Sequence, residues 1–353
     1  MPTTSPAEPP SAPRVGRMLA DAYGLQEARL TRLDGQVAVN YRCTTADGQV
    51  VFVKHYQPGA VLAVEEDTMA QTRLAGRHGV PVAAVVPSAS GALITRDAGT
   101  AISVWQWMPG RTVEDGLGPV EQAASGHTLG RIHRAFAGHP AGTRPAPKAD
   151  GWLAPDLVAR EATIDRLLDI IRDRADPDEF DRRAADTLTE RRAQMRRLPA
   201  LLAGLPPLHR QVVHGDYSPK NILFDDGAVS AVVDFGPAEP FLSAWELGRI
   251  AFDPRSVVLR PDWVASGVTL VSAYLDANPL LPADDVIACA RVTHIELVRS
   301  LYGVKQHYLR PGLHQADLDQ FWLLRHQAAG KLLDRLDEVE AALAQVAHAG
   351  ECL

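Results

Sequence analysis

The sequence predicts an α+β protein with two lobes, a small one built around a sheet and a larger one built mainly from helices. Short alternating apolar segments, typical of strands, fill most of the first hundred residues, and one internal helical pattern interrupts them. After Pro109-Gly110 the apolar spacing becomes predominantly helical. The chain has 353 residues, enough for two medium-sized domains. We expect a small lobe at 17–108 and a larger lobe at 109–353, after a disordered leader at 1–16.

The small lobe should contain an antiparallel sheet and one internal helix. In Asp34–Tyr56 two apolar runs are joined at Ala46-Asp47-Gly48, which is a hairpin signal. The helical pattern Val61–Gly79 is closed by its glycine. The other elements that we expect here are a helix at 17–25 and strands at 28–33, 91–95 and 101–108.

The larger lobe should consist of amphipathic helices with one interruption. Leu129, Ile132, His133 and Phe136 follow the i, i+3, i+4, i+7 spacing of a buried helical stripe. Helical patterns also cover 154–174, 177–198 and most of the chain after residue 283. The interruption is the segment 212–236, "VVHGDYSPKNILFDDGAVSAVVDFG", in which two short apolar runs predict two strands.

Composition narrows the class of protein. The residues are 46% hydrophobic and 22% charged, and the formal net charge of −7 disfavours nucleic-acid binding. No stretch approaches the roughly 18 apolar residues of a membrane span, and the N-terminus lacks the apolar core of a signal peptide. Three widely spaced cysteines fit a reducing compartment. Together these features favour a cytoplasmic protein without a membrane or nucleic-acid partner.

Three oxygen-bearing side chains stand out in the segment 212–236. The short turn between the two strands makes them antiparallel, so Asn221 at the start of the first strand should lie near Asp234 at the end of the second. An amide oxygen and a carboxylate suit Mg²⁺. Asp216, one loop earlier, could accept a proton from a substrate hydroxyl. Each residue alone is more often a turn or strand-end residue, but the spacing of all three favours a catalytic site.

The segment "HGDYSPKN" followed by "DFG" resembles the catalytic and metal-binding segments of the aminoglycoside phosphotransferase family, also called choline/homoserine kinase-like phosphotransferases. Three further segments, "VFVK", "WQWMPG" and "LGRIH", resemble the family's ATP-lysine strand, interlobe hinge and large-lobe helix. The resemblance covers roughly Leu30–Pro254. It implies the two-lobed protein-kinase-like fold, with Asp216 as catalytic base and Asn221 and Asp234 as Mg²⁺ ligands.

On the nucleotide side, the resemblance implies that Lys54 contacts the phosphates of ATP, or of GTP, and pairs with an acidic residue on the helix. The run "VEED" offers Glu65, Glu66 and Asp67 for this pair, and we favour Glu66. The turn that contains Gly35 would cover the phosphates. The adenine should meet backbone groups at Gln106, Trp107 and Met108.

The catalytic segment also has supporting positions. Glu246 stands where the family usually has an aspartate, and we expect it to tie the start of its helix to the catalytic loop, while His214 holds that loop. Lys220 is either an exposed lysine or a phosphate contact. A protein kinase is disfavoured because no long activation segment follows Asp234. The residues also leave open a nucleotide-binding pseudokinase scaffold and, with less support, a metal-dependent hydrolase.

The acceptor is expected to be a hydroxyl-bearing small molecule. The family phosphorylates aminoglycosides and other antibiotics, homoserine, choline or methylthioribose, so both an antibiotic-resistance role and a metabolic role stay open. Glu296 and Arg299 are close enough on one helix to pair with each other. The candidate acceptor-pocket residues are Asp253, Glu296, Arg299, Tyr302 and His307.

Overall fold

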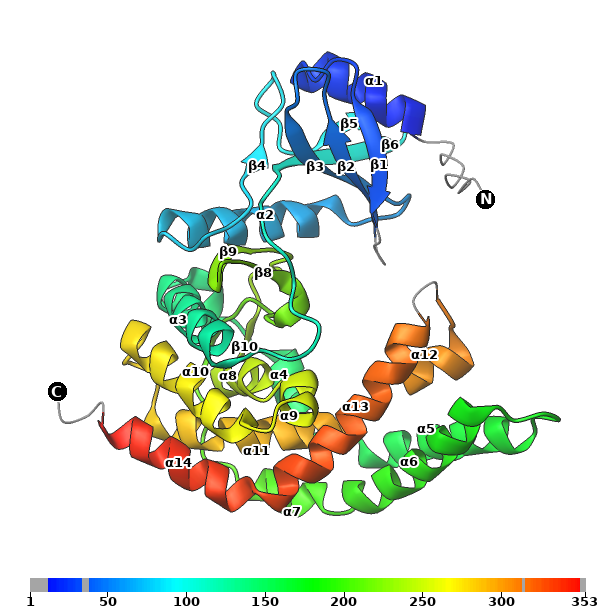
Figure 1. Cartoon of the computed structure of the whole chain (residues 1–353), viewed down its shortest axis with the longest axis vertical. Coiled ribbons are helices and arrows are strands. Elements are labelled where there is room, and N and C mark those ends of the chain that lie inside the picture. The colour runs from blue at the N-terminus through cyan, green and yellow to red at the C-terminus, as the bar shows by residue number, and fades with distance from the viewer. Residues whose placement is uncertain (1–11, 34–37, 313–314, 350–353) are drawn as a thin grey trace. The chain divides into compact units, whose positions relative to one another are not determined.

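The computed structural model describes residues 12–33, 38–312 and 315–349. The chain forms two compact units (Figure 1). The first contains Met1–Gly110 and Ser230–Pro237, and the second contains Arg111–Val229 and Ala238–Leu353. The first unit carries an antiparallel sheet and the second is mainly helical, which confirms the predicted α+β class. Within the described residues, no helix is long and apolar enough to span a membrane.

The sheet of the first unit has the strand order β1-β2-β3-β6-β4, with β5 paired to β6, and every pair is antiparallel. Tyr41 lies opposite Val53, and Val53 lies opposite Val104. These side chains form one apolar core with Val15 of the N-terminal helix. The strands are β1 (Arg29–Leu33), β2 (Ala38–Thr44), β3 (Val50–Tyr56), β4 (Val85–Val86), β5 (Thr95–Asp97) and β6 (Thr100–Gln106).

Two helices accompany this sheet, α1 (Ala12–Tyr23) and α2 (Leu62–Arg77). The prediction of a leader up to residue 16 is wrong for its last residues, because α1 begins at Ala12 and buries Val15. Residues 1–11 of the predicted leader lie outside the described residues. The strand expected at 91–95 is also misplaced: a turn with Gly91 at φ +83° delays it, and β5 begins at Thr95.

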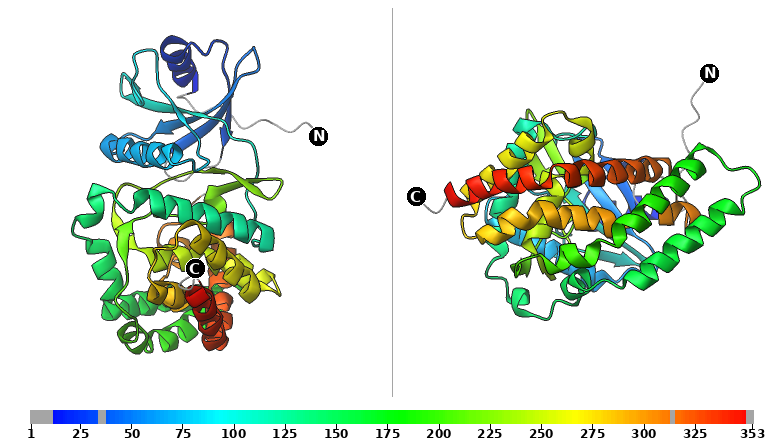
Figure 2. Two further views of the ribbon diagram at one scale, coloured as in Figure 1. Left: turned by 90° about the vertical axis from the view of Figure 1, so that its left-hand side faces the viewer. Right: turned by 90° about the horizontal axis from the view of Figure 1, so that it is seen from below.

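The second unit is a packed set of helices (Figure 2). Its centre is the pair α3 and α10, which approach closely because two glycines of α3 face α10. A Cβ atom added to Gly130 would lie 2.5 Å from the carbonyl oxygen of Tyr274, and one added to Gly126 would collide with that of Leu270. Helix α13 contacts both α6 and α11. The helices up to residue 203 are α3 (Pro119–Phe136), α4 (Pro147–Leu153), α5 (Leu157–Arg172), α6 (Glu179–Met195) and α7 (Leu198–Ala203), with a short 3₁₀ turn η1 (Pro140–Thr143).

The strands of the 212–236 region interrupt the helices, as predicted. β7 (Arg210–Val212) pairs with β10 (Pro240–Leu242), and β8 (Ile222–Asp225) pairs with β9 (Ala228–Val232). A loop and the 3₁₀ turn η2 (Pro219–Asn221) connect β7 to β8. The helices that follow are α8 (Ser243–Ala251), α9 (Pro254–Leu259), α10 (Trp263–Ala277), α11 (Ala283–Arg299), α12 (Val304–Leu309), α13 (Gln315–Asp334) and α14 (Leu336–Ala349).

Candidate active site

The loop between β7 and β8 presents Asp216. Gly215 adopts φ +91°, a left-handed conformation that favours glycine, and lets the chain turn just before the aspartate. The backbone N–H of Asp216 donates to Nδ1 of His214 at 3.2 Å, and His214 is fully buried. The expectation that His214 holds this loop is confirmed by that contact. The backbone around Asp216 is therefore fixed by buried neighbours.

Glu246 of α8 ties this loop to the helical core. Its carboxylate accepts the backbone N–H of His214 at 2.8 Å and that of Gly215 at 2.6 Å, and it pairs with Nε2 of His133 at 3.1 Å. Burial works to raise the pKa of Glu246, but the contacts with His133 and His214 outweigh it and lower that pKa. Tyr274 completes the chain of contacts through Nδ1 of His133 at 2.9 Å. The predicted structural role of Glu246 is confirmed.

The carboxylate of Asp216 has three polar partners on its own unit. Arg249 donates to one oxygen, while Lys220 Nζ at 3.0 Å and Asn221 Nδ2 at 2.9 Å contact the other. Burial works to raise the pKa of Asp216, but Arg249 and Lys220, helped by Asn221, hold it below the usual range. The group is therefore an ionised carboxylate at neutral pH, able to accept a proton.

Arg249 was not anticipated from the sequence. It lies three residues after Glu246 on α8, so both side chains project from neighbouring positions of one helix face. Its position could have been predicted from the sequence, because a helix that directs Glu246 toward the catalytic loop also directs Arg249 toward that loop. Lys220, whose role the sequence left open, has a side chain that is 69% exposed and pairs with Asp216.

Asn221 is held in a defined orientation beside Asp216. Its Nδ2 donates to the carboxylate and, at 2.8 Å, to the backbone carbonyl of Asp216, so its amide oxygen faces the other way. Such an oxygen suits a hard cation. Among the described residues, no group of three or more His, Cys, Asp or Glu side chains is placed to hold a metal ion. Asp234, at φ +61°, belongs to the first unit, and its ligand role stays a prediction.

On the first unit, Lys54 of β3 forms an ion pair at 3.0 Å with Glu65 of α2. The preference for Glu66 is therefore wrong. Successive helical positions are about 100° apart, so only one of the two glutamates can face the sheet. The side chain of Glu65 is 18% exposed, whereas that of Glu66 is 54% exposed and lies 3.5 Å from Arg96.

The other nucleotide-side residues lie at the end of β6. Gln106 is the last residue of that strand, and its backbone N–H donates to Ala84 at 2.8 Å. The guanidinium of Arg42 lies over the ring of Trp107, 5.2 Å from its centre. Met108 is partly buried. Gly35 lies outside the described residues.

Two of the residues proposed for the acceptor, Glu296 and Arg299, lie close together on α11, with Nη1 of Arg299 3.9 Å from Oε2 of Glu296. Trp152 donates to Glu296 at 2.8 Å, and Arg325 of α13, which the sequence did not suggest, lies 3.9 Å from the same carboxylate. Asp253 instead caps α9 by accepting the backbone N–H of Arg255 at 3.0 Å.

The two remaining acceptor candidates differ in their surroundings. Tyr302 is 40% exposed. His307 pairs with Asp319 at 2.9 Å and packs against the ring of Phe180, 4.5 Å between centres. These contacts give His307 a structural role between α12, α13 and α6, and the structure does not join it to Glu296 by any contact that it describes.

Comparison with known families identifies the chain. Residues 29–279 match the phosphotransferase enzyme family (APH). The chain belongs to this family. The match covers most of the sequence and confirms the resemblance drawn from the segments around Asp216. No curated protein matches the chain at a significant level.

Solved structures agree on the fold of this phosphotransferase. An aminoglycoside phosphotransferase from Alicyclobacillus acidocaldarius has a TM-score of 0.59 at 16% identity, covering 99% of this chain and 98% of the other. A spectinomycin phosphotransferase bound to AMP has a TM-score of 0.66 at 12% identity, covering 91% and 99%. An amicoumacin kinase solved with AMP-PNP and Ca²⁺ has a TM-score of 0.61 at 18% identity, covering 91% and 93%. At these identities the likeness establishes the kinase-like fold.

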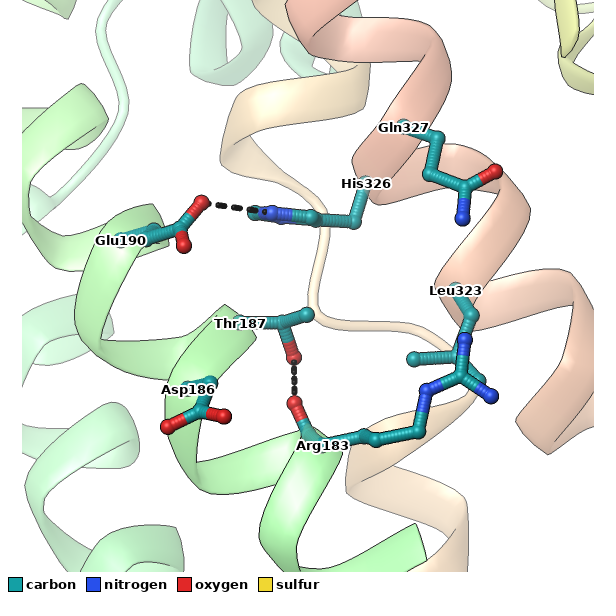
Figure 3. Close-up of a pocket in the computed structure, with 7 residues that line it drawn as sticks. All are labelled: Arg183, Asp186, Thr187, Glu190, Leu323, His326 and Gln327. Atoms are coloured by element: carbon teal, nitrogen blue, oxygen red, sulfur yellow. Dashed lines mark hydrogen bonds and ion pairs between the residues drawn. The ribbon is translucent and has the colours of Figure 1, made fainter.

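The phosphotransferase also has a shallow pocket of about 220 Å³ between α6 and α13 (Figure 3). Two of its lining residues, His326 and Glu190, contact each other at 2.9 Å. None of the residues predicted to act in catalysis or binding lines it. The lining residues are Arg183, Asp186, Thr187, Glu190, Leu323, His326 and Gln327.

Proposed function

We propose that the chain is an ATP-dependent kinase that transfers the γ-phosphoryl group to a hydroxyl of a small molecule. The observation that carries this proposal is Asp216, an ionised carboxylate whose loop is fixed by the buried Glu246. A base held this way costs little reorganisation when the substrate arrives. Membership of the phosphotransferase family supports the same reaction class.

In the proposed reaction, Asp216 accepts the proton of the substrate hydroxyl as its oxygen attacks the γ-phosphorus. One P–O bond forms to the acceptor, and the bond between the γ-phosphorus and the bridging oxygen to the β-phosphate breaks. Asn221 and Asp234 would hold Mg²⁺, which neutralises phosphate charge. Lys54, oriented by Glu65, would contact the α- and β-phosphates. The adenine would meet the segment Gln106–Met108.

Relatives of the same fold support the choice of nucleotide. An amicoumacin kinase was solved with AMP-PNP, and a spectinomycin phosphotransferase with ADP and with AMP. ATP is therefore our first choice, with GTP as the variant to compare. We place the enzyme in the cytoplasm as a monomer or homodimer, acting on an antibiotic or a metabolite.

A protein kinase and a pseudokinase scaffold fit this fold less well. A protein kinase needs a long segment after the Asp-Phe-Gly motif to hold its peptide substrate, but here α8 begins at Ser243, nine residues after Asp234. A nucleotide-binding pseudokinase scaffold would not need a base with three ordered polar partners. The set Lys54, Asp216, Asn221 and Asp234 favours the active enzyme.

The test is the variant Asp216→Asn. We expect acceptor-dependent ATP turnover to fall by about 10²-fold or more, because the base is lost. Mg·ATP affinity measured by calorimetry should change little. The matched control is Asp226→Asn, which removes an exposed carboxylate from the β8–β9 turn, at φ 51°, where asparagine is tolerated. Near-normal turnover in Asp216→Asn would refute the mechanism.

A further inference from the structure

Among the described residues of the second unit, seven arginines have a guanidinium group over an aromatic ring, and four of these arginines lie on α8, α9, α11 and α13. The distances from guanidinium carbon to ring centre are 5.0 Å for Arg249 over Trp245, 4.8 Å for Arg255 over Phe321, 5.2 Å for Arg299 over Trp152 and 5.7 Å for Arg325 over Phe321.

Stacking of this kind prepares an arginine for a ligand. The aromatic face fixes the plane of the guanidinium, while the N–H donors point outward in that plane. A guanidinium that is already oriented loses less side-chain entropy when an anion binds, and it can bind a carboxylate or phosphate with two parallel hydrogen bonds.

Contacts and electrostatics connect these arginines to the catalytic base. Arg249 donates a hydrogen bond to the carboxylate of Asp216, and its positive charge also helps to lower the pKa of Arg325. Arg325 and Arg299 each lie 3.9 Å from Glu296, too far for a good hydrogen bond. The set therefore extends from the site of proton transfer to the carboxylate of Glu296 within one unit.

Within the described part of the chain, Arg325 is the member of the set with buried donors that lack an acceptor. Its Nε and Nη2 atoms are buried and donate no hydrogen bond among the residues that the structure describes. A buried charge without full hydrogen bonding is costly, and an anionic ligand would supply the missing acceptors. Burial also lowers the pKa values of Arg325 and Arg299, against the opposing charge of Glu296 and, for Arg325, of Asp253.

The numbers of cationic and anionic side chains around Arg325 and Arg299 also favour an anionic ligand. Among the described residues joined by these contacts, cationic side chains outnumber carboxylates, and burial raises the pKa of one of those carboxylates, Asp253. The cations are Lys220, Arg249, Arg255, Arg299 and Arg325, and the carboxylates are Asp216, Asp253 and Glu296. A polycationic acceptor such as an aminoglycoside would be repelled here.

We propose that the acceptor carries an anionic group, a carboxylate or phosphate, in addition to its reacting hydroxyl. The anionic group binds Arg325 and Arg299, and the hydroxyl faces Asp216. Arg249 stands between these two ends. This inference rests on the proposed kinase function and narrows its substrate class to hydroxy acids and phosphorylated hydroxy compounds.

The test uses matched probes that differ in charge alone as far as chemistry allows: glycerate, glyceramide and aminopropanediol, with phosphoglycerate as a stronger anion. Binding to the full chain is measured by calorimetry without nucleotide. We expect the two anions to bind and the amine to bind least. Arg325→Met should weaken binding of the anions by about tenfold or more, because hydrogen bonds to a charged group are lost.

The matched control is Lys331→Met, which removes an exposed cation from the same helix. Methionine at 325 keeps the packing against Phe321, so the variant should fold, and Arg299→Gln gives a second variant on a different helix. No preference for the anions, or a preference that survives Arg325→Met, would overturn the inference. Failure of the kinase function is distinct from this result, because it would appear as absent Mg·ATP binding or absent phosphorylated product.

Discussion

Glu246→Ala is the variant that most directly tests how the catalytic loop is held. The substitution removes the carboxylate that accepts the backbone N–H groups of His214 and Gly215 and that pairs with His133. Glu246, His133 and His214 are all 0% exposed, so water cannot easily replace the acceptor that His133 and the N–H of His214 lose, whereas Gly215 is exposed and its N–H can bond to water.

The size of the effect follows from the number of donors left without partners. Each buried N–H without an acceptor costs about 1–3 kcal/mol, and the loss of His133's partner adds to this. Removing a buried charge returns part of the cost, because its desolvation is relieved. We expect a net loss of about 3–5 kcal/mol in the free energy of unfolding, which is the usual range for breaking a buried ion pair. Glu246→Gln keeps one acceptor oxygen and should lose less.

The assay combines urea unfolding with steady-state kinetics. Because the loop carries Asp216, turnover number should fall more than the apparent affinity for Mg·ATP. The control is Glu239→Ala, since Glu239 is partly exposed, pairs with Lys148 at the surface, and should contribute within about 0.5 kcal/mol. An unfolding midpoint and a turnover number in Glu246→Ala that both equal those of the wild type would refute the reasoning.

Two further predictions use other contacts. Glu65→Gln should weaken Mg·ATP binding by calorimetry, because Lys54 loses its charged partner, whereas Glu66→Gln should not; equal effects would contradict the assignment. Burial raises the pKa of Asp285 to about 6, above its value in the unfolded chain. The contribution of this group to the free energy of unfolding is therefore present at low pH and is lost as pH rises through about 6. In denaturant titrations, the free energy of unfolding of Asp285→Asn relative to that of the wild type should rise by up to about 3 kcal/mol between about pH 4 and pH 7. A difference that does not change with pH would contradict this.

The catalytic loop could be predicted from the sequence because its characteristic residues lie in one short contiguous segment. Asp216 and Asn221 are five residues apart, and local turn geometry alone brings them together. Glu246 could be placed because the family pattern has an acidic residue at that point. Both inferences depend on spacing along the chain rather than on the packing of distant helices.

The remaining features depend on helix rotation and packing that a single sequence does not specify. The choice between Glu65 and Glu66 requires the rotation of α2 about its axis, set by how its buried residues meet the sheet. Arg325 reaches Glu296 because α13 contacts α11, and these helices are separated in the chain by α12. The start of α1 was missed because the Pro/Ser/Ala-rich composition suggested a leader, while the burial of Val15 on the sheet favours a helix.

The central claim is transfer of a phosphoryl group to a small-molecule hydroxyl. The most direct measurement is mass spectrometry of acceptors incubated with Mg²⁺ and ATP isotopically labelled in its γ-phosphoryl oxygens, using hydroxy acids, phosphorylated sugars, amino alcohols, hydroxylated antibiotics and a host-cell extract. The account predicts an acceptor that gains one labelled phosphoryl group with the wild type but not with Asp216→Asn. Measurable Mg·ATP binding with no labelled acceptor, even in the extract, would contradict it and favour a nucleotide-binding scaffold.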